Sequence, residues 1–246
     1  MRYLILSDIH GNWEALEAVL HQARDGYDAV LCCGDLVGYG ADPNAVVDWA
    51  RTHLDAIVRG NHDKACAGME DLEWFNPVAR AAARWTGRTL TPENLDYVRN
   101  LPRGPLDFDS FQILHGSPID EDDYLVSTFA VSQLRNSLDR AVSFFGHTHM
   151  QGGFLLHRHG VRRIPKLRSD ADQHALELDP GSWYLINPGS VGQPRDGDPR
   201  AAYVFYEPGA RLVEYRRVAY DVEAAQKKIL AAGLPPLLAE RLETGN

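Results

Sequence analysis

Cysteine is scarce in this chain, with three cysteines among 246 residues. Cys32 and Cys33 are adjacent within an apolar run and Cys66 stands alone, so no C-x-x-C spacing and no disulfide framework is present. The first residues also lack the succession of charged, apolar and small residues that forms a signal peptide. Both features are typical of a protein in a reducing compartment, and we expect a cytoplasmic location.

Long apolar runs and an excess of positive charge are missing too. The apolar runs fall far short of the roughly 20 residues that a membrane-spanning helix needs, so no membrane span is expected. Lys and Arg total 25 against 34 Asp and Glu, a formal net charge of −9, which disfavours extended contact with duplex nucleic acid. With 44% hydrophobic residues and no linker or repeat, residues 1–246 are interpreted as one globular domain.

The first quarter of the chain alternates between strand and helix patterns. Strands are expected at 1–7, 27–33 and 54–58, and helices at 12–24 and 43–53. Asn12 is suited to cap the first helix, and Pro43 is suited to begin the second. Continuous apolar strands separated by helices favour a parallel sheet in an α/β fold, with ligands bound beyond the carboxyl ends of the strands.

The later sequence predicts an insertion and a second group of strands. Residues 64–101 have helical patterns and are interpreted as a helical insertion. Further strands are expected at 111–114, 141–145, 154–156, 184–186, 202–206 and 212–217, with helices at 128–138 and within 221–242. Glycine-containing turns between the strands after residue 152 favour antiparallel hairpins.

Polar clusters follow five of the predicted strands. They are Ser7-Asp8-Ile9-His10, Gly34-Asp35, Gly60-Asn61-His62-Asp63, His115-Gly116 and Gly146-His147-Thr148-His149. Asp8, Asp35 and Asn61 follow one another at intervals of 27 and 26 residues, the length of one strand-helix-strand step, so their side chains can converge. Oxygen and imidazole ligands without thiolate suit Mn²⁺, Fe²⁺ or Zn²⁺, and their number exceeds one tetrahedral shell, which favours two metal ions.

The order of these clusters, D-x-H, G-D, G-N-H-D, H and G-H-x-H, resembles that of the calcineurin-like metallophosphoesterases from residue 1 to about residue 206. The stretches GDLVGYG after Cys33 and NPGSVGQPRDGDPRA from Asn187 are similar to the small bacterial and archaeal phosphodiesterase branch, whose relatives include diadenosine tetraphosphate hydrolases. The resemblance implies a four-layer α/β/β/α sandwich.

The resemblance also implies a role for each strand-end side chain. One metal ion would be held by Asp8, His10, Asp35 and His149, and the other by Asp35, Asn61, His115 and His147. Asp35 would bridge the two ions, which a shared carboxylate can keep about 3.5–4 Å apart. A metal-bound hydroxide would attack phosphorus, and His62 would contact the phosphate and protonate the leaving oxygen.

Several residues near these motifs carry weaker expectations. Asn12, Tyr39 and Arg195 are candidate substrate-binding residues because they adjoin the motif loops, although Asn12 is also explained as a helix cap. Gly38 occupies the position where the protein phosphatases of the family carry an Asp, so Asp63 or a backbone carbonyl is expected to orient His62, unless Asp63 caps the following helix.

Two further groups of side chains are interpreted as structural and not as parts of a functional site. The aromatic side chains of the insertion are expected to pack in a helical core rather than to stack on a substrate; they are Trp74, Phe75, Trp85 and Tyr97. The basic stretch 157–168 is interpreted as a solvated hairpin.

Taken together, these observations predict a dinuclear metal-dependent phosphoesterase, with manganese favoured over iron and zinc. Its substrate would be a small phosphodiester or phosphoanhydride, such as a nucleotide or a dinucleoside polyphosphate. The alternatives are a hydrolase specific for diadenosine polyphosphates and a non-catalytic metal-binding scaffold of the same fold. A haloacid-dehalogenase site is disfavoured because His10 stands where its second Asp belongs, and no Gly-x4-Gly-Lys-[Ser/Thr] loop is present.

Overall fold

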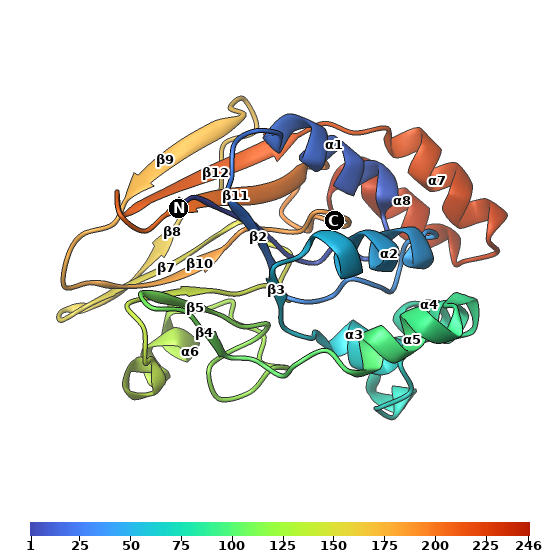
Figure 1. Cartoon of the computed structure of the whole chain (residues 1–246), viewed down its shortest axis with the longest axis horizontal. Coiled ribbons are helices and arrows are strands. Elements are labelled where there is room, and N and C mark those ends of the chain that lie inside the picture. Colours follow the sequence, from blue (N-terminus) through green and yellow to red (C-terminus); the bar gives the residue numbers. More distant parts are fainter.

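The computed structural model covers residues 1–246 and contains two six-stranded mixed β-sheets (Figure 1). Sheet A has the order β3 (Ala56–Ile57), β2 (Ala29–Cys32), β1 (Tyr3–Leu6), β11 (Ala201–Glu207), β12 (Leu212–Val218) and β9 (Gln173–Glu177). Sheet B has the order β4 (Leu106–Asp107), β5 (Phe111–Ile113), β6 (Val142–Phe144), β10 (Trp183–Asn187), β7 (Gly152–His157) and β8 (Gly160–Ile164).

Eight α-helices and two short 3₁₀ helices accompany the sheets. They are α1 (Trp13–Ala23), α2 (Pro43–His53), α3 (Asn61–Cys66), η1 (Leu72–Trp74), α4 (Pro77–Thr89), α5 (Pro92–Arg99), α6 (Thr128–Gln133), η2 (Arg135–Ser137), α7 (Val222–Ala231) and α8 (Pro236–Thr244). None of these helices combines the length and the apolar composition that a membrane span requires.

The parallel strands predicted at the start of the chain are confirmed. β1 pairs with β2 and β2 with β3, both in parallel register, and α1 and α2 form the crossovers. The side chain of Asn12 caps α1 by accepting a hydrogen bond from the backbone N–H of Ala15. Because the strands run in parallel, the loops that follow β1, β2 and β3 all leave the same edge of sheet A.

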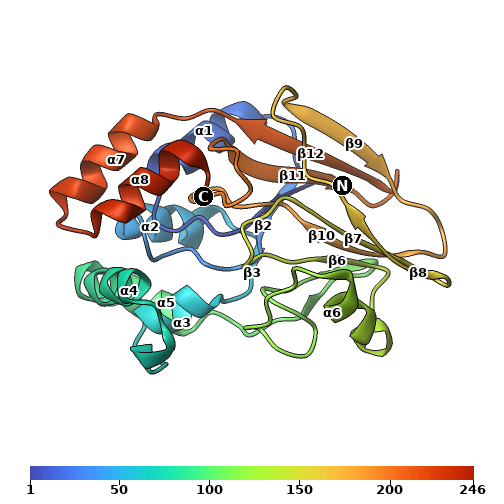
Figure 2. The same cartoon turned by 180° about the vertical axis from the view of Figure 1, so that it is seen from behind.

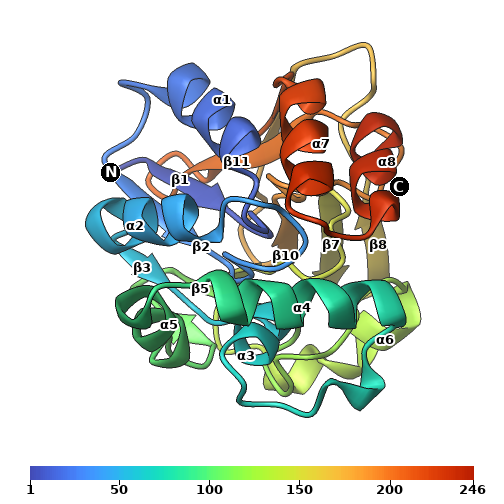
Figure 3. The ribbon, with the colours of Figure 1, turned by 90° about the vertical axis from the view of Figure 1, so that its right-hand side faces the viewer.

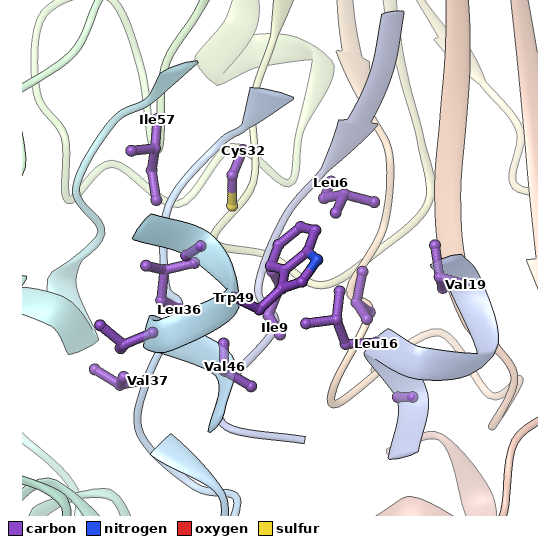
Figure 4. Packing of buried hydrophobic residues seen from close by; sticks show 14 of the residues in the cluster. Leu6, Ile9, Leu16, Val19, Cys32, Leu36, Val37, Val46, Trp49 and Ile57 are labelled. Atoms are coloured by element: carbon purple, nitrogen blue, oxygen red, sulfur yellow. The ribbon is translucent and has the colours of Figure 1, made fainter. Parts of the chain in front are cut away.

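Three apolar clusters lie between the layers of sheets and helices that Figure 2 shows. The first lies between sheet A and helices α1 and α2, where Leu16 and Trp49 pack near Leu6 and Cys32 (Figure 4). The second fills the space between the sheets and contains Cys33, which points away from Cys32 because side chains alternate along a strand. The third packs α6 on the outer face of sheet B, which completes a helix-sheet-sheet-helix arrangement.

The predicted helical insertion 64–101 contains η1, α4, α5 and the second half of α3. In Figure 3, helix α4 lies below α7 and α8. Its residues Ala79 and Ala82 belong to a separate apolar cluster that also includes Leu238 and Leu242 of α8. This contact places the beginning of α4 near the loops that leave sheet A.

Several element boundaries differ from those predicted. The strand expected at 54–58 is formed only by Ala56–Ile57, and the helix expected at 128–138 is divided into α6 and η2. The strands β4 and β9 were not predicted, whereas β8 pairs with β7 in an antiparallel hairpin, as expected for the stretch 157–168. β9 is an edge strand in which four of the five residues are exposed, so it lacks the alternation that identifies a half-buried strand.

Candidate metal centre

The loops at the carboxyl ends of β1, β2, β3, β5 and β6 bring polar side chains to one place. Six of the expected metal ligands form two groups whose ligand atoms lie within 4.8 Å of one another. The first group is Asp8, His10, Asp35 and His149, and the second is Asp35, His115 and His147. The seventh, Asn61, joins the second group with its Oδ1 atom 3.2 Å from Nε2 of His115. Asp35 is the one side chain shared by both groups.

Five of these residues have left-handed backbone conformations, which are uncommon for residues other than glycine. Their φ angles are 52° for Asp8, 52° for His10, 57° for Asp35, 66° for His147 and 58° for His149. Hydrogen bonds between the loops hold these conformations: the backbone N–H of His10 donates to the carbonyl oxygen of Asp35, and that of Asp8 donates to Gly34. Such strained positions concentrate at functional sites.

Three of the histidines are oriented by backbone carbonyl groups. Nδ1 of His10 donates to the carbonyl oxygen of Val37 (3.0 Å), Nδ1 of His115 donates to that of Cys33 (2.7 Å), and Nδ1 of His149 donates to that of Gln193. A proton fixed at Nδ1 leaves the lone pair at Nε2 available for a ligand. The rings of His10 and His149 therefore present acceptor nitrogens to the centre of the site, and His115 is oriented to do the same once it has lost its second proton.

The buried atoms of the site fit divalent cations. Oδ2 of Asp8 and Oδ2 of Asp35 are buried without a hydrogen-bond partner, an arrangement that is costly for a carboxylate. Nε2 of His10 also lies 3.0 Å from Nε2 of His149, although the proton of each ring is engaged at Nδ1. A cation bound among these atoms would satisfy the carboxylates and accept the two lone pairs. The absence of thiolate ligands is consistent with a hard or borderline metal ion.

The electrostatics of the site keep most of the imidazoles neutral. Burial lowers the pKa of His10 and His149 well below the usual value and lowers that of His147 to about 3. Burial opposes ionisation of Asp35, but the neighbouring His115 holds the pKa of that carboxyl well below its usual range. The neutral His10, His147 and His149 and the ionised Asp35 are in the protonation states that metal ligation requires. Burial opposes protonation of His115, but Asp35 raises its pKa to about 9, so His115 would have to release a proton when a metal binds.

His62 lies beside the shared carboxylate at the beginning of α3. Its backbone N–H donates to Oδ1 of Asp35 (2.8 Å), its side chain is 4% exposed, and its ring centroid lies 4.2 Å from that of Tyr39. Nδ1 of His62 is buried without a partner. A Cβ atom at Gly38 would lie 2.7 Å from this nitrogen, so only glycine leaves room for the ring at its present position.

The orienting role expected for Asp63 is wrong. Its carboxylate accepts hydrogen bonds from the backbone N–H groups of Gly60, Asp35 and Leu36, each at 2.9 Å, and none from His62. Asp63 therefore caps α3, as the alternative interpretation held, and in addition ties the loop after β2 to the loop after β3. No backbone carbonyl replaces it at Nδ1 of His62.

A cavity of about 240 Å³ opens above the two ligand groups. Its lining residues are Asp35, Tyr39, Asn61, His62, Trp74, Phe75, Asn76, Ala79, His147, His149 and Arg195. Arg195 donates from Nη2 to the hydroxyl oxygen of Tyr39 and to Oε1 of Gln193, both at 3.1 Å. Asn12, by contrast, is not part of this lining, because its amide donates to the carbonyl oxygen of Gly192 and its oxygen caps α1.

Three residues near the centre lie outside the sequence motifs, and only Trp74 among them was considered from the sequence, where core packing was favoured over substrate stacking. Tyr124 places its ring 5.0 Å from that of His147 and donates its hydroxyl proton to the carbonyl oxygen of Thr148 (3.3 Å). Trp74 and Asn76 come from the helical insertion and line the cavity. These three residues reach the site through tertiary packing.

Comparisons with known proteins identify the family. A sequence model described as the calcineurin-like phosphoesterase superfamily domain matches residues 1–208. The chain is 36% identical over 253 residues to the uncharacterized protein MJ0912 of Methanocaldococcus jannaschii, with 98% of this chain and 97% of that protein covered. The chain therefore belongs to the calcineurin-like phosphoesterase superfamily, a family of phosphoester hydrolases, as the strand-end motifs predicted.

Solved structures confirm the predicted sandwich fold. The crystal structure of a metallophosphoesterase from Sphaerobacter thermophilus matches with a TM-score of 0.86 and 38% identity, covering 100% of this chain and 99% of that chain. The crystal structure of protein PH1004 from Pyrococcus horikoshii OT3 shares the fold, with a TM-score of 0.78, 19% identity, and 100% and 98% of the two chains covered. The two mixed sheets flanked by helices are thus those of a metallophosphoesterase.

Proposed function

We propose that the protein hydrolyses small phosphodiesters or phosphoanhydrides with two divalent cations, Mn²⁺ in the first place and Fe²⁺ or Zn²⁺ as alternatives. The observation that carries this proposal is the position of Asp35, whose carboxylate belongs to both ligand groups and keeps one buried oxygen without a partner. Cations bound there would polarise the phosphoryl oxygens and lower the pKa of an attacking water.

Arg195 is the residue proposed to bind the phosphoryl group. It lines the cavity, and its Nε atom is buried without a hydrogen-bond partner. A guanidinium group with a free donor suits a phosphate oxygen, and the hydrogen bond to Tyr39 fixes its plane. Arg195 would therefore orient the substrate over the ligand groups and offset its negative charge.

His62 is proposed to donate a proton to the leaving oxygen. Nδ1 is buried against Gly38, which leaves Nε2 as the ring nitrogen available to a ligand in the cavity. Burial lowers the pKa of His62 to about 4, so the ring is neutral in the free protein. A phosphoryl anion in the cavity favours the protonated ring, because an opposite charge raises the pKa of an imidazole. Substrate binding would therefore favour the protonated form of His62, which is the form that can donate a proton to the leaving oxygen.

The sequence leaves two alternatives to this proposal. One is a hydrolase specific for diadenosine polyphosphates, and the other is a scaffold of the same fold that binds metal without catalysis. The intact set of ligands together with His62 in the cavity favours catalysis. The three cysteines are free thiols, which supports the cytoplasm as the location of the enzyme.

The test is hydrolysis by the Mn²⁺-loaded protein of bis-p-nitrophenyl phosphate, p-nitrophenyl phosphate and diadenosine tetraphosphate, together with metal analysis. His62→Ala should retain two metal equivalents and lose about 10²- to 10⁴-fold in kcat, the usual contribution of general acid catalysis. Asp35→Ala should lose both metal and turnover. His21→Ala, at an exposed position of α1, is the control and should behave as the wild type. Metal binding without hydrolysis of any of the three substrates would support the scaffold.

A further inference from the structure

Trp74 is exposed at the mouth of the cavity. Its side chain is 93% exposed, yet it lines the same cavity as His62 and Arg195. Large aromatic side chains usually contribute to stability by burial, which this ring does not do. The expectation that Trp74 packs in a helical core is therefore wrong, and its exposed ring calls for another explanation.

The backbone on both sides of Trp74 is held by hydrogen bonds. Asp71 accepts from the backbone N–H of Glu73 (3.0 Å), and Asn76 caps α4 by accepting from Ala79 (2.9 Å). Arg80 reaches back from α4 and donates to the carbonyl oxygens of Glu73 (2.9 Å) and Phe75 (3.1 Å). Trp74 therefore belongs to a segment whose backbone is held in place by these hydrogen bonds.

Phe75 connects this segment to the catalytic end of the site. Its ring contacts His62 edge-on at a centroid distance of 5.4 Å, and it packs against the apolar cluster between α4 and α8. Trp74 is therefore directly attached to a residue that contacts the proposed proton donor. The contacts of Phe75 with His62 and with the apolar cluster fix the backbone from which the exposed indole projects.

The residues that line the cavity form two chemically different parts. One part consists of ligating and cationic groups, namely Asp35, Asn61, His147, His149 and Arg195, and suits a phosphoryl group. The other part comes from Tyr39 and from the insertion, whose contributions are Trp74, Phe75, Asn76 and Ala79. A phosphate alone needs only the first part. A ligand that fills both parts carries a phosphoryl group and, next to it, an apolar planar group.

We propose that Trp74 stacks on a nucleobase of the substrate, so that the natural substrate is a phosphoester or phosphoanhydride of a nucleoside. This inference rests on the proposed function, because it takes the phosphoryl group to lie over the metal centre. Stacking of a base on an aromatic side chain contributes about 1–3 kcal/mol, which corresponds to about fivefold or more in affinity. Trp74 is then a specificity residue and takes no part in the chemical step.

The test compares adenosine 5′-monophosphate with ribose 5-phosphate, which differ only in the base. Calorimetric titration of the Mn²⁺-loaded protein should show at least about fivefold tighter binding of adenosine 5′-monophosphate. In Trp74→Ala this advantage should disappear while the affinity for ribose 5-phosphate stays unchanged, and Trp74→Phe should keep part of it. Phe129→Ala removes another exposed aromatic ring, 75% exposed and outside the cavity lining, and should change neither affinity.

Two results would overturn the stacking role: equal affinities of the wild type for the two ligands, or an equal loss of both affinities in Trp74→Ala. Because the titration measures binding, it gives its answer whether or not the protein turns over a substrate. Failure of the proposed function is recognised separately, by the absence of hydrolysis in the wild type.

Discussion

The carboxylate of Asp63 lies 2.9 Å from the backbone nitrogen of Asp35 and accepts its hydrogen bond. The same side chain accepts from the backbone N–H groups of Gly60 and Leu36, so one fully buried residue joins the loops after β2 and β3. Asp35 belongs to both ligand groups of the metal centre. Asp63 thus positions the shared carboxylate through the backbone, without contributing a ligand atom.

Asp63→Asn should weaken metal binding more than catalysis. An amide offers one acceptor oxygen in place of two, so at least one backbone N–H group of these loops loses its partner. We expect the Mn²⁺ concentration for half-maximal hydrolysis of bis-p-nitrophenyl phosphate to rise about 10- to 100-fold, with kcat at saturating Mn²⁺ close to that of the wild type.

Asp221→Asn is the matched control, because Asp221 also accepts a backbone hydrogen bond, as the cap of α7, but lies outside the site. It should leave the Mn²⁺ dependence unchanged. An Asp63→Asn variant with the Mn²⁺ dependence of the wild type would show that the positioning role is incorrect.

Arg195→Ala should lower kcat/KM about 10- to 100-fold, the usual range for losing a hydrogen bond to a charged group. Its metal content should not change, because Arg195 is not among the groups that gather around Asp35. Tyr39→Phe should have a smaller effect, since it removes only the 3.1 Å hydrogen bond that holds the guanidinium group. Steady-state kinetics with metal analysis measure both quantities. Wild-type kcat/KM in Arg195→Ala would remove this residue from the phosphate site.

Gly192 lets the loop after β10 approach the loop after β1. Its backbone N–H donates to the carbonyl oxygen of Asp8 (3.0 Å), and a Cβ atom at this position would lie 1.9 Å from the carbonyl oxygen of Ile9. Gly192→Ala should therefore lower the free energy of unfolding by about 1–3 kcal/mol or more, as measured by urea denaturation. Gly209→Ala, where a Cβ atom meets nothing within 4 Å, should be nearly neutral. Equal stability of the two variants would contradict the close approach.

The strand-end ligands could be predicted from the sequence because they depend on a local rule. Asp8, Asp35 and Asn61 each follow a buried strand, and parallel strands bring such positions to one sheet edge without knowledge of the remaining contacts. The histidine clusters after the predicted strands 111–114 and 141–145 were visible in the sequence as well, and the family resemblance assigned each histidine to one of the two metal ions. The two-sheet architecture followed from the same information.

The surroundings of the centre could not be predicted in this way. The exposure of Trp74 depends on where α4 packs against α8, and the partners of Asp63 depend on the distance between two loops. Neither relationship leaves a periodic pattern in the sequence. The polar edge strand β9 was missed for a similar reason, since its pairing with β12 rather than its side chains defines it.

Asp198 and Arg200 form an ion pair whose contribution to stability should depend on pH. Arg200 donates from Nη2 to Oδ2 of Asp198 (2.7 Å) and from Nε to Oδ1 (3.0 Å), and Asp198 is 3% exposed. Burial alone would raise the pKa of Asp198, but the hydrogen bonds from Arg200 hold it below its usual value. A carboxyl with a lowered pKa stabilises the fold fully above its unfolded pKa of about 3.9, and loses this contribution as the pH falls further.

Asp198→Asn should therefore be less stable than the wild type by about 1.5–3 kcal/mol near neutral pH, and this difference should shrink as the pH falls below about 4. Urea unfolding of both proteins between about pH 7 and about pH 3 measures the difference. Asp170 offers a matched control, because Arg168 makes the same two-pronged contact with it on the surface. Since exposed ion pairs contribute little, Asp170→Asn should match the wild type at every pH. A constant stability difference for Asp198→Asn across this range would mean that the charge of Asp198 does not stabilise the fold.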